Sequence, residues 1–215
     1  MKRIFLVDDH PMLREGLSRL IENKSGCQIC GESETASDAL DAIPAAAPDI
    51  VLMDISLPDK SGLELIKDLQ ARFPELRILV FSMHDEMLYA ERVMRAGAKG
   101  YLMKGESTEK LIEAIDCVLS GGLYLSRRVC DHVLNSMSKN RSPGKAGPQS
   151  LTDRELEIFE LIGRGRTNAQ IAAQLHISPK TVDAHRTNMR TKLSLPDSAS
   201  LMREAVLWVE LAAAN

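Results

Sequence analysis

The feature that most constrains the fold of this chain is an alternation of short apolar runs with longer amphipathic stretches over its first half. Most of these runs are rich in β-branched residues and are too short for a buried helix, which is typical of strands buried on both faces. Strands that alternate with helices predict a doubly wound parallel sheet. The predicted strands cover residues 3–7, 27–32, 49–53, 77–82 and 100–103.

Polar side chains stand at the carboxyl ends of four of these strands. Asp8 and Asp9 follow the first strand and Asp54 follows the third, while Ser82 ends the fourth and Lys104 follows the fifth. Because ligands of doubly wound sheets bind beyond the carboxyl ends of the strands, we expect these side chains to form one site. Any one of the aspartates alone would be interpreted more simply as the cap of a following helix.

Three carboxylates in one place repel one another, so the predicted site needs a cation. Oxygen ligands without His or Cys favour a hard ion, and Mg²⁺ fits best. Lys104 and Ser82 would supply an ammonium group and a hydroxyl to the oxygens of a phosphate. A carboxylate aimed at phosphorus beside Mg²⁺ can act as a nucleophile and form an aspartyl phosphate.

The composition is that of a globular protein, with 44% hydrophobic and 27% charged residues among 215. No apolar run approaches the roughly 20 residues of a membrane helix. The apolar run near the N-terminus covers only residues 4–7, which is too short for a signal peptide, so we expect a cytoplasmic protein. Cys27 and Cys30 form a lone C-x-x-C without the further ligands of a zinc site, and we interpret them as ordinary side chains.

The charge changes along the chain. Residues 1–125 carry 14 Lys and Arg against 21 Asp and Glu, residues 126–150 carry 5 against 1, and residues 151–215 carry 8 against 8. The segment 138–150 is rich in Gly, Pro and Ser and predicts a flexible linker. An acidic first part and a basic middle predict two bodies with different partners.

The part after the linker predicts a bundle of four helices. Thr152 and Glu155 form a capping-box pattern at the start of the first helix. A short helix over 167–175, a tight turn and a longer helix that starts at Ser178 and Pro179 form a helix-turn-helix pattern. From Ser178 to Lys192 the count is four basic residues against one acidic, which is an electrostatic pattern of DNA binding, although a solvated helix face is the simpler alternative.

The first part resembles the receiver domain of two-component response regulators over residues 3–123. The motifs that carry this resemblance are "LVDDHPMLREGL", "DIVLMDISLPDKSGLELI", "ILVFSMHD" and "AGAKGYLMK". It implies a flavodoxin-like, CheY-like (βα)5 fold in which Asp54 accepts a phosphoryl group from the phosphohistidine of a sensor kinase. The implied Mg²⁺ ligands are Asp8, Asp9, Asp54 and the backbone carbonyl of Ser56, and the implied switch residues are Ser82, Lys104 and the aromatic Tyr101.

Two positions depart from that family pattern. Gly105 follows Lys104 where many receivers have a proline, often in a cis peptide, which puts the cis bond in doubt but not the lysine. The switch hydroxyl is Ser82 rather than the commoner threonine, which keeps the hydrogen-bonding group.

Residues 150–211 resemble the LuxR/NarL-type DNA-binding domain through "LTDRELEIFELIGRGRTNAQIAAQLHISPKTVDAHRTNMRTKL". The resemblance implies four helices, the third in the major groove of DNA and the fourth as a dimer surface. His185 lies on the inward side by spacing, so we favour a packing role over a ligand role. By position the residues expected to face bases are Lys180, Thr181, Asp183, Ala184 and Thr187, and those expected to contact phosphates are Arg186, Arg190 and Lys192.

The last predicted helix, residues 197–211, carries an apolar stripe that we interpret as the dimer surface. The alternative is that the whole stripe packs inside its own domain. The stripe consists of Leu201, Ala205, Val206, Trp208 and Val209, with Leu211 continuing it.

We therefore predict a NarL/LuxR-type response regulator with a receiver at 1–123, a linker at 124–149 and a LuxR-type helix-turn-helix domain at 150–215. It is expected to be a transcription regulator rather than an enzyme, with Mg²⁺ as cofactor. Its expected partners are a sensor histidine kinase, promoter DNA, a second copy of the chain and, as a further candidate, RNA polymerase.

Three alternatives stay open. The first is a DNA-binding protein that is regulated without phosphate and whose receiver acts only as a dimerisation scaffold. Labelling with a phosphodonor and Mg²⁺ distinguishes it from our prediction. A receiver that regulates through protein partners is separated by a DNA-binding assay. A phosphatase of the haloacid-dehalogenase type would need a second Asp at position 56, where this chain has Ser56.

Overall fold

The computed structural model describes residues 1–24, 26–131 and 147–214, and the chain divides into two compact units, residues 1–139 and 140–215. Most of the predicted linker, including 138–146, lies outside the described residues. None of the helices in the described ranges is long and apolar enough to cross a membrane. Cys27, Cys30, Cys117 and Cys130 are free cysteines.

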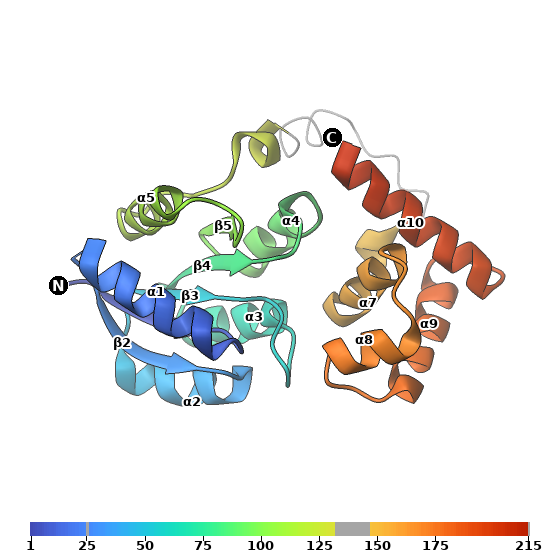
Figure 1. The fold of residues 1–215 in the computed structure, drawn as a ribbon, viewed down its shortest axis with the longest axis horizontal. Coiled ribbons are helices and arrows are strands. Elements are labelled where there is room, and N and C mark those ends of the chain that lie inside the picture. Colours follow the sequence, from blue (N-terminus) through green and yellow to red (C-terminus); the bar gives the residue numbers. More distant parts are fainter. Residues whose placement is uncertain (25, 132–146, 215) are drawn as a thin grey trace. The chain divides into compact units, whose positions relative to one another are not determined.

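The N-terminal unit is built on a parallel sheet with the strand order β2-β1-β3-β4-β5 (Figure 1). The chain changes direction across the sheet between β1 and β3, which is the place where doubly wound folds bind ligands. The strands begin and end within one residue of the predicted limits. They are β1 (Arg3–Val7), β2 (Gln28–Ser33), β3 (Ile50–Met53), β4 (Arg77–Ser82) and β5 (Gly100–Met103).

Helices cover both faces of this sheet (Figure 1). One face packs on α1 (Pro11–Lys24) and α5 (Thr108–Leu119), whose apolar sides meet alternate residues of the strands, such as Leu6 and Leu52. The other face packs on α2 (Ala36–Ala46), α3 (Gly62–Arg72) and α4 (Glu86–Ala96).

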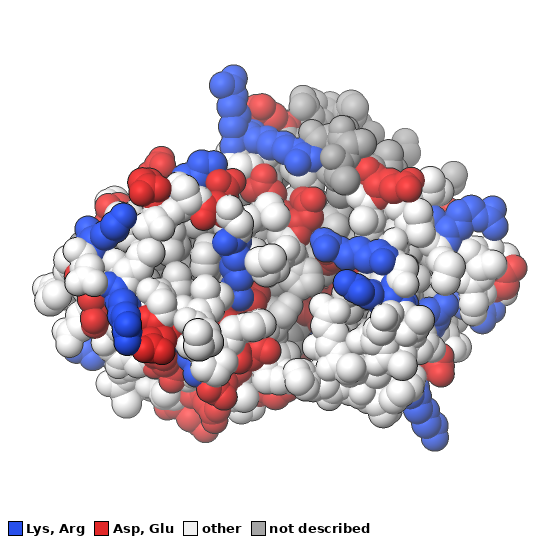
Figure 2. Space-filling view, in the orientation of Figure 1, with Lys and Arg blue, Asp and Glu red and all other residues white. Residues whose placement is uncertain are grey.

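Because both faces of the sheet are buried, polar side chains can reach solvent or a ligand only at the ends of the strands. The acidic excess of this unit lies outside the core, and Figure 2 shows Asp and Glu side chains gathered over α2 and the neighbouring end of β2.

The elements of the C-terminal unit in the described residues are helices. Its helices are the short η1 (Pro148–Ser150), α7 (Asp153–Gly163), α8 (Asn168–Gln174), α9 (Pro179–Lys192) and α10 (Ser198–Ala214). Thr152 and Glu155 form the predicted capping box, and Ser178 caps α9 as predicted. A second capping box at Thr167, which the sequence analysis did not identify, starts α8.

The peptide after Lys104 is not cis, since no cis peptide bond occurs in the described part of the chain.

The packing of α3 on the loop after β3 can be tested at Gly62, the first residue of that helix. An added Cβ would lie 2.5 Å from the Cα of Ile55 and 2.7 Å from the carbonyl oxygen of Asp54, and backbone atoms do not move aside cheaply. We expect Gly62→Ala to lower the free energy of unfolding by about 2–3 kcal/mol in urea denaturation. Gly16→Ala in α1 is the matched control, because nothing lies within 4 Å of its added Cβ, and it should raise stability by about 0.5–1 kcal/mol. Equal stability of the two variants would contradict this packing.

Candidate functional site

The carboxyl ends of β1 and β3 bring the predicted carboxylates together. One ligand atom each from Asp8, Asp9, His10 and Asp54 lies within 4.8 Å of the others. Asp8 and Asp54 are buried, with 4% and 3% of their surfaces exposed. They meet because β1 and β3 are paired neighbours, so residues that follow the two strands leave the sheet side by side.

Lys104 is the cation that compensates the two buried carboxylates. Its Nζ lies 2.6 Å from Asp8 Oδ2 and 2.5 Å from Asp54 Oδ2, and the lysine side chain is only 5% exposed. Burial alone would lower the pKa of Lys104, but the facing charges and hydrogen bonds of Asp54 and Asp8 raise it above its ordinary value. The lysine is therefore protonated and fixed between the carboxylates.

Hydroxyl and backbone donors complete the surroundings of Asp54. Ser82 Oγ donates a hydrogen bond to Asp54 Oδ1 over 2.7 Å, and the backbone N–H of Ser56 donates to the same oxygen over 3.2 Å. Ser82 is fully buried at the end of β4, and its carbonyl accepts from the N–H of Lys104. Asp54, Ser82 and Lys104 thus form one connected group across three strand ends.

Tyr101 is linked to this group through the loop after β4. Its ring is 1% exposed, so it already lies inside the unit, and its hydroxyl donates to the carbonyl oxygen of His84 over 3.0 Å. The ring of His84 in turn places Nε2 2.6 Å from Ser56 Oγ. A movement of this loop would therefore change the hydrogen bond of Tyr101.

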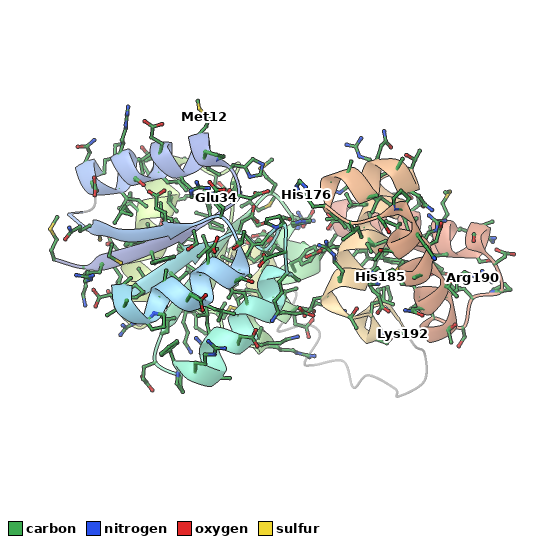
Figure 3. All side chains as sticks on the ribbon, turned by 90° about the horizontal axis from the view of Figure 1, so that it is seen from below. Met12, Glu34, His176, His185, Arg190 and Lys192 are labelled. Carbon is green, nitrogen blue, oxygen red and sulfur yellow. The ribbon has the colours of Figure 1, made fainter. Side chains whose placement is uncertain are left out.

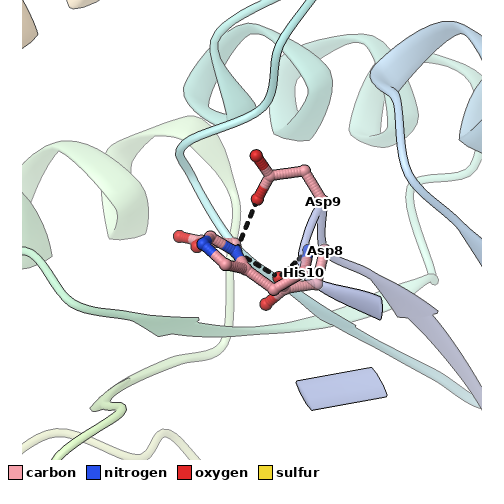
Figure 4. Close-up of side chains that lie close together, drawn as sticks. Asp8, Asp9 and His10 are labelled. Atoms are coloured by element: carbon pink, nitrogen blue, oxygen red, sulfur yellow. Dashed lines mark hydrogen bonds and ion pairs between the residues drawn. The ribbon is translucent and has the colours of Figure 1, made fainter. Parts of the chain in front are cut away.

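His10 belongs to the acidic cluster and was missed by the sequence analysis. Its Nδ1 lies 3.0 Å from Asp8 Oδ1 and 2.7 Å from Asp9 Oδ1, as Figure 4 shows. The signal in the sequence that could have identified it is that His10 directly follows the two aspartates. Because 66% of this side chain is exposed, the ring can leave the carboxylates without loss of packing.

The residues expected to face DNA bases are exposed on α9. In this order along the helix, they are Lys180, Thr181, Asp183, Ala184 and Thr187. Thr187 Oγ1 donates to the carbonyl of Asp183 within the helix, as threonine often does.

The three cations expected to contact phosphates already have partners. Arg186 Nη1 donates to Asn168 Oδ1 over 3.2 Å, and Arg190 Nη2 donates to the carbonyl oxygen of Pro196 over 2.6 Å. Lys192 Nζ lies 2.7 Å from Glu155 Oε2, the carboxylate of the capping box of α7. This ion pair ties α9 to α7, so a phosphate would compete with Glu155 for Lys192, and the phosphate contact of Lys192 stays a prediction.

His185 lies half-buried on the inner side of α9, on the same unit as Arg190 and Lys192 (Figure 3). Its pKa is lowered mainly by burial, with help from the positive charges of Arg154 and Lys192, and the negative charge of Glu155 opposes the shift. A half-buried neutral ring favours the packing role over a ligand role.

Part of the stripe on α10 is not available for the dimer surface that we expected. Leu201 and Ala205 are fully buried within their own unit, and the ring of Trp208 packs 5.5 Å from that of Phe159 in α7. A Cβ on Gly163 of α7 would come within 2.7 Å of a methyl group of Val209, which shows how closely the two helices approach.

The alternative that this stripe is intradomain core is therefore right for Leu201 and Ala205. The side of α10 that remains available carries Met202 and Leu207, 47% and 46% exposed, with Val206 partly exposed beside them. The side chain of Leu211 lies outside the described part of the chain.

Comparison with known families assigns both units. The family model described as response regulator receiver domain matches residues 4–116, and the model described as bacterial regulatory proteins, luxR family, matches residues 149–205. Among curated relatives, the transcriptional regulatory protein MctR of Rhizobium johnstonii is 34% identical over 204 residues, which cover 95% of this chain and 92% of that protein. The response regulator UvrY of Escherichia coli K12 is 34% identical over 209 residues, covering 96% and 94% of the two chains.

Solved structures show the same architecture. A LuxR-family two-component response regulator from Aurantimonas sp. SI85-9A1 superposes with a TM-score of 0.59 at 35% identity, covering 64% of this chain and 98% of the other. RcsB, solved as two dimers bound to two parallel DNAs, superposes with a TM-score of 0.59 at 23% identity, covering 94% and 97% of the chains. At that identity the second likeness supports the fold alone.

The lowered pKa of His185 predicts a pH dependence of stability. The folded state disfavours the charged ring, so the unfolded chain binds the proton first as the pH falls. The stabilising contribution of the neutral ring is present above the unfolded pKa of about 6.5 and is lost as the pH falls through the lower folded pKa. We expect the unfolding midpoint of the C-terminal unit in urea to fall less between about pH 7.5 and about pH 5.5 in His185→Gln than in the wild type.

The control for this measurement is His176→Asn, which removes an exposed imidazole from the same unit and keeps a residue that tolerates the left-handed φ of 52°. In this control the unfolding midpoint should fall between the two pH values as much as it does in the wild type. An equally large fall in His185→Gln would contradict the destabilising effect assigned to protonation of His185.

Proposed function

Because the chain belongs to the NarL/LuxR-type response regulators, the transcription regulators of two-component systems, we propose that Asp54 is its phosphoacceptor and that phosphorylation controls DNA binding by α9. The observation that carries this proposal is the position of Asp54. Its carboxylate is buried at a strand end, between the donors Lys104 and Ser82 and beside two further aspartates. A carboxylate with only a structural role would need a counter-charge, but not two neighbouring carboxylates that repel it.

The transfer itself needs little from the protein besides positioning. An oxygen of Asp54 forms a bond to phosphorus while the bond from phosphorus to the histidine nitrogen of the kinase breaks, and that nitrogen keeps the electron pair. Lys104 lies close enough to Asp54 to balance the added negative charge. The donor is a sensor histidine kinase, as the receiver domain implies.

Mg²⁺ fits the donor set of the site. Lys104 contacts Asp8 Oδ2 and Asp54 Oδ2, while Asp8 Oδ1 and Asp54 Oδ1 accept from His10 and from Ser82 and Ser56. An ion would share these carboxylates with their present donors and take the carboxylate of Asp9 once the exposed ring of His10 moves away. We assign Asp8, Asp9, Asp54 and the carbonyl of Ser56 as its ligands. The ion would supply the positive charge that neutralises phosphoryl oxygens.

Ser82 and Tyr101 form the proposed switch. The hydroxyl of Ser82 now binds Asp54 itself, and a phosphoryl group on Asp54 offers it a more strongly charged acceptor. Moving Ser82 displaces the loop that follows it, including His84, whose carbonyl holds the hydroxyl of Tyr101. The signal would reach α4 and β5 in this way.

DNA binding is assigned to α9 on the exposed residues described above, with Arg186, Arg190 and Lys192 toward phosphates. We further propose that two copies bind DNA together through the exposed side of α10, formed by Met202, Val206 and Leu207. We propose a cytoplasmic location, which suits a kinase and promoter DNA as partners, and RNA polymerase is a further candidate partner at a promoter.

Asp54→Asn keeps the size of the side chain and removes the nucleophile. Incubated with an acyl phosphate and Mg²⁺, the wild type should gain one phosphoryl group by intact mass spectrometry and the variant none. Asp116→Asn, an exposed carboxylate on α5, is the control and should be labelled like the wild type. Labelling of the Asp54→Asn variant at the wild-type level would remove Asp54 from the proposed role.

Asp9→Ala removes one of three adjacent carboxylates. We expect Mg²⁺ binding, measured by calorimetry, to weaken at least about tenfold, because a divalent ion loses a charged ligand. Without Mg²⁺ the free energy of unfolding should stay equal or rise slightly, because repulsion among the carboxylates is relieved. Unchanged affinity for Mg²⁺ would take Asp9 out of the site, and Asp116→Ala should leave that affinity unchanged.

Met202→Glu places a charge on the exposed side of α10 without disturbing the core, since 47% of Met202 is exposed. The variant should fold and bind a single DNA half-site as the wild type does, but lose the tighter binding to paired half-sites and its steeper salt dependence. Fluorescence anisotropy with both DNA types measures this. Wild-type affinity for paired sites would show that two copies do not meet through this side of α10.

A further inference from the structure

Asp183 is an anomaly on a helix that is assigned to DNA. It is the single acidic residue of α9, and it is exposed near the start of that helix. A carboxylate close to DNA phosphates is repelled by them, so it weakens binding unless it gains a specific contact. Its presence among the outward-facing residues therefore needs a physical reason.

The structure shows that this carboxylate is held in place by a residue from another helix. Asn168, the first residue of α8, donates from Nδ2 to Asp183 Oδ1. The carbonyl oxygen of the same side chain, Oδ1, accepts from Arg186 Nη1 over 3.2 Å. One amide thus binds an acid and a base of α9 at the same time.

This bridge keeps Asp183 and Arg186 apart. Residues three apart on a helix lie on the same side, and an acid and a base at that spacing pair readily. In that case each would neutralise the other, and neither would be presented to DNA. With Asn168 between them, Asp183 keeps Oδ2 as an acceptor and Arg186 keeps its remaining N–H donors, and neither group has another partner among the described residues.

The chemistry of a fixed acceptor limits the base that it can recognise. In the major groove only the amino groups of cytosine and adenine donate hydrogen bonds, and carboxylates are suited to cytosine N4. Guanine O6 or thymine O4 at that place would face the carboxylate with a second acceptor.

We propose that Asp183 selects cytosine at one position of each half-site, and that Asn168 is the positioning residue that makes this selection effective. The inference rests on the proposed function of α9. A cation at this position would bind DNA more tightly. A carboxylate lowers the affinity for DNA but distinguishes cytosine from the other bases.

The test is a selection of bound sequences from a random DNA library with the full chain, phosphodonor and Mg²⁺. We compare the wild type with Asp183→Asn, Asn168→Ala and the control Gln174→Ala, an exposed position of α8. The wild type should enrich cytosine at one position. Asp183→Asn should change that position to adenine, because an amide reads adenine with both its groups, and should leave the other positions unchanged.

Asn168→Ala should reduce the preference for cytosine about tenfold at that position only. The double variant Asp183→Asn with Asn168→Ala should show nearly the same sequence preference as Asp183→Asn alone, because both changes disrupt the same hydrogen-bonded group. A protein in which Asn168 had only a structural role would lose affinity equally for all sequences. Gln174→Ala should match the wild type.

An unchanged sequence preference in Asp183→Asn overturns the inference and leaves the proposed function standing. A wild type that enriches no sequence overturns both. A uniform loss of affinity in Asn168→Ala, with the cytosine preference intact, removes Asn168 from the proposal.

Discussion

The contact of Lys104 with Asp8 and Asp54 is the interaction on which the receiver unit depends. It joins residues that follow three different strands, and in the order β2-β1-β3-β4-β5 the lysine starts two strands away from Asp54 and three away from Asp8. Strands lie about 4.8 Å apart, so only a long side chain spans that distance. Removing the ammonium group would leave two buried carboxylates without a counter-charge. The resulting loss of folding free energy would be far larger than the net stabilisation that the ion pairs provide.

Under the proposed function, the same contact explains how a buried site would respond to phosphorylation. The lysine and Ser82 bind Asp54 through hydrogen bonds that a phosphoryl group can compete for, since it offers more charge and more acceptor oxygens. A single hydrogen bond joins the side chains of Ser82 and Asp54, and Tyr101 is connected to the Ser82 loop through the carbonyl of His84. The energy of one local charge change can therefore bias a larger element, which is what a switch requires.

The fold was predictable from the sequence because strands that are buried on both faces consist of short apolar runs. Polar residues are then confined to the ends of these strands. Asp8, Asp54, Ser82 and Lys104 were visible for that reason. His10 was not, since an exposed imidazole after a strand resembles any loop residue and only its distances reveal the contact.

The helical unit shows the opposite limit of prediction. Spacing identified the apolar stripe of α10 but could not say which neighbour covers it, and Leu201 and Ala205 turned out to be core. Likewise no local pattern links Asn168 to Asp183, or Lys192 to Glu155, because these pairs are set by how α8 and α7 cross α9. The charged residues of α9 could be counted from the sequence. The partners that Arg186, Arg190 and Lys192 bind within their own unit could not be predicted from it.

The central claim is that a phosphoryl group on Asp54 changes the affinity of the other unit for DNA. The most direct measurement titrates paired half-site DNA with wild-type protein, with and without an acyl phosphate and Mg²⁺, while mass spectrometry follows the phosphorylated fraction. The account predicts binding at least about tenfold tighter once Asp54 is phosphorylated, a coupling of about 1.4 kcal/mol. Equal affinity of fully phosphorylated and unphosphorylated protein would contradict it.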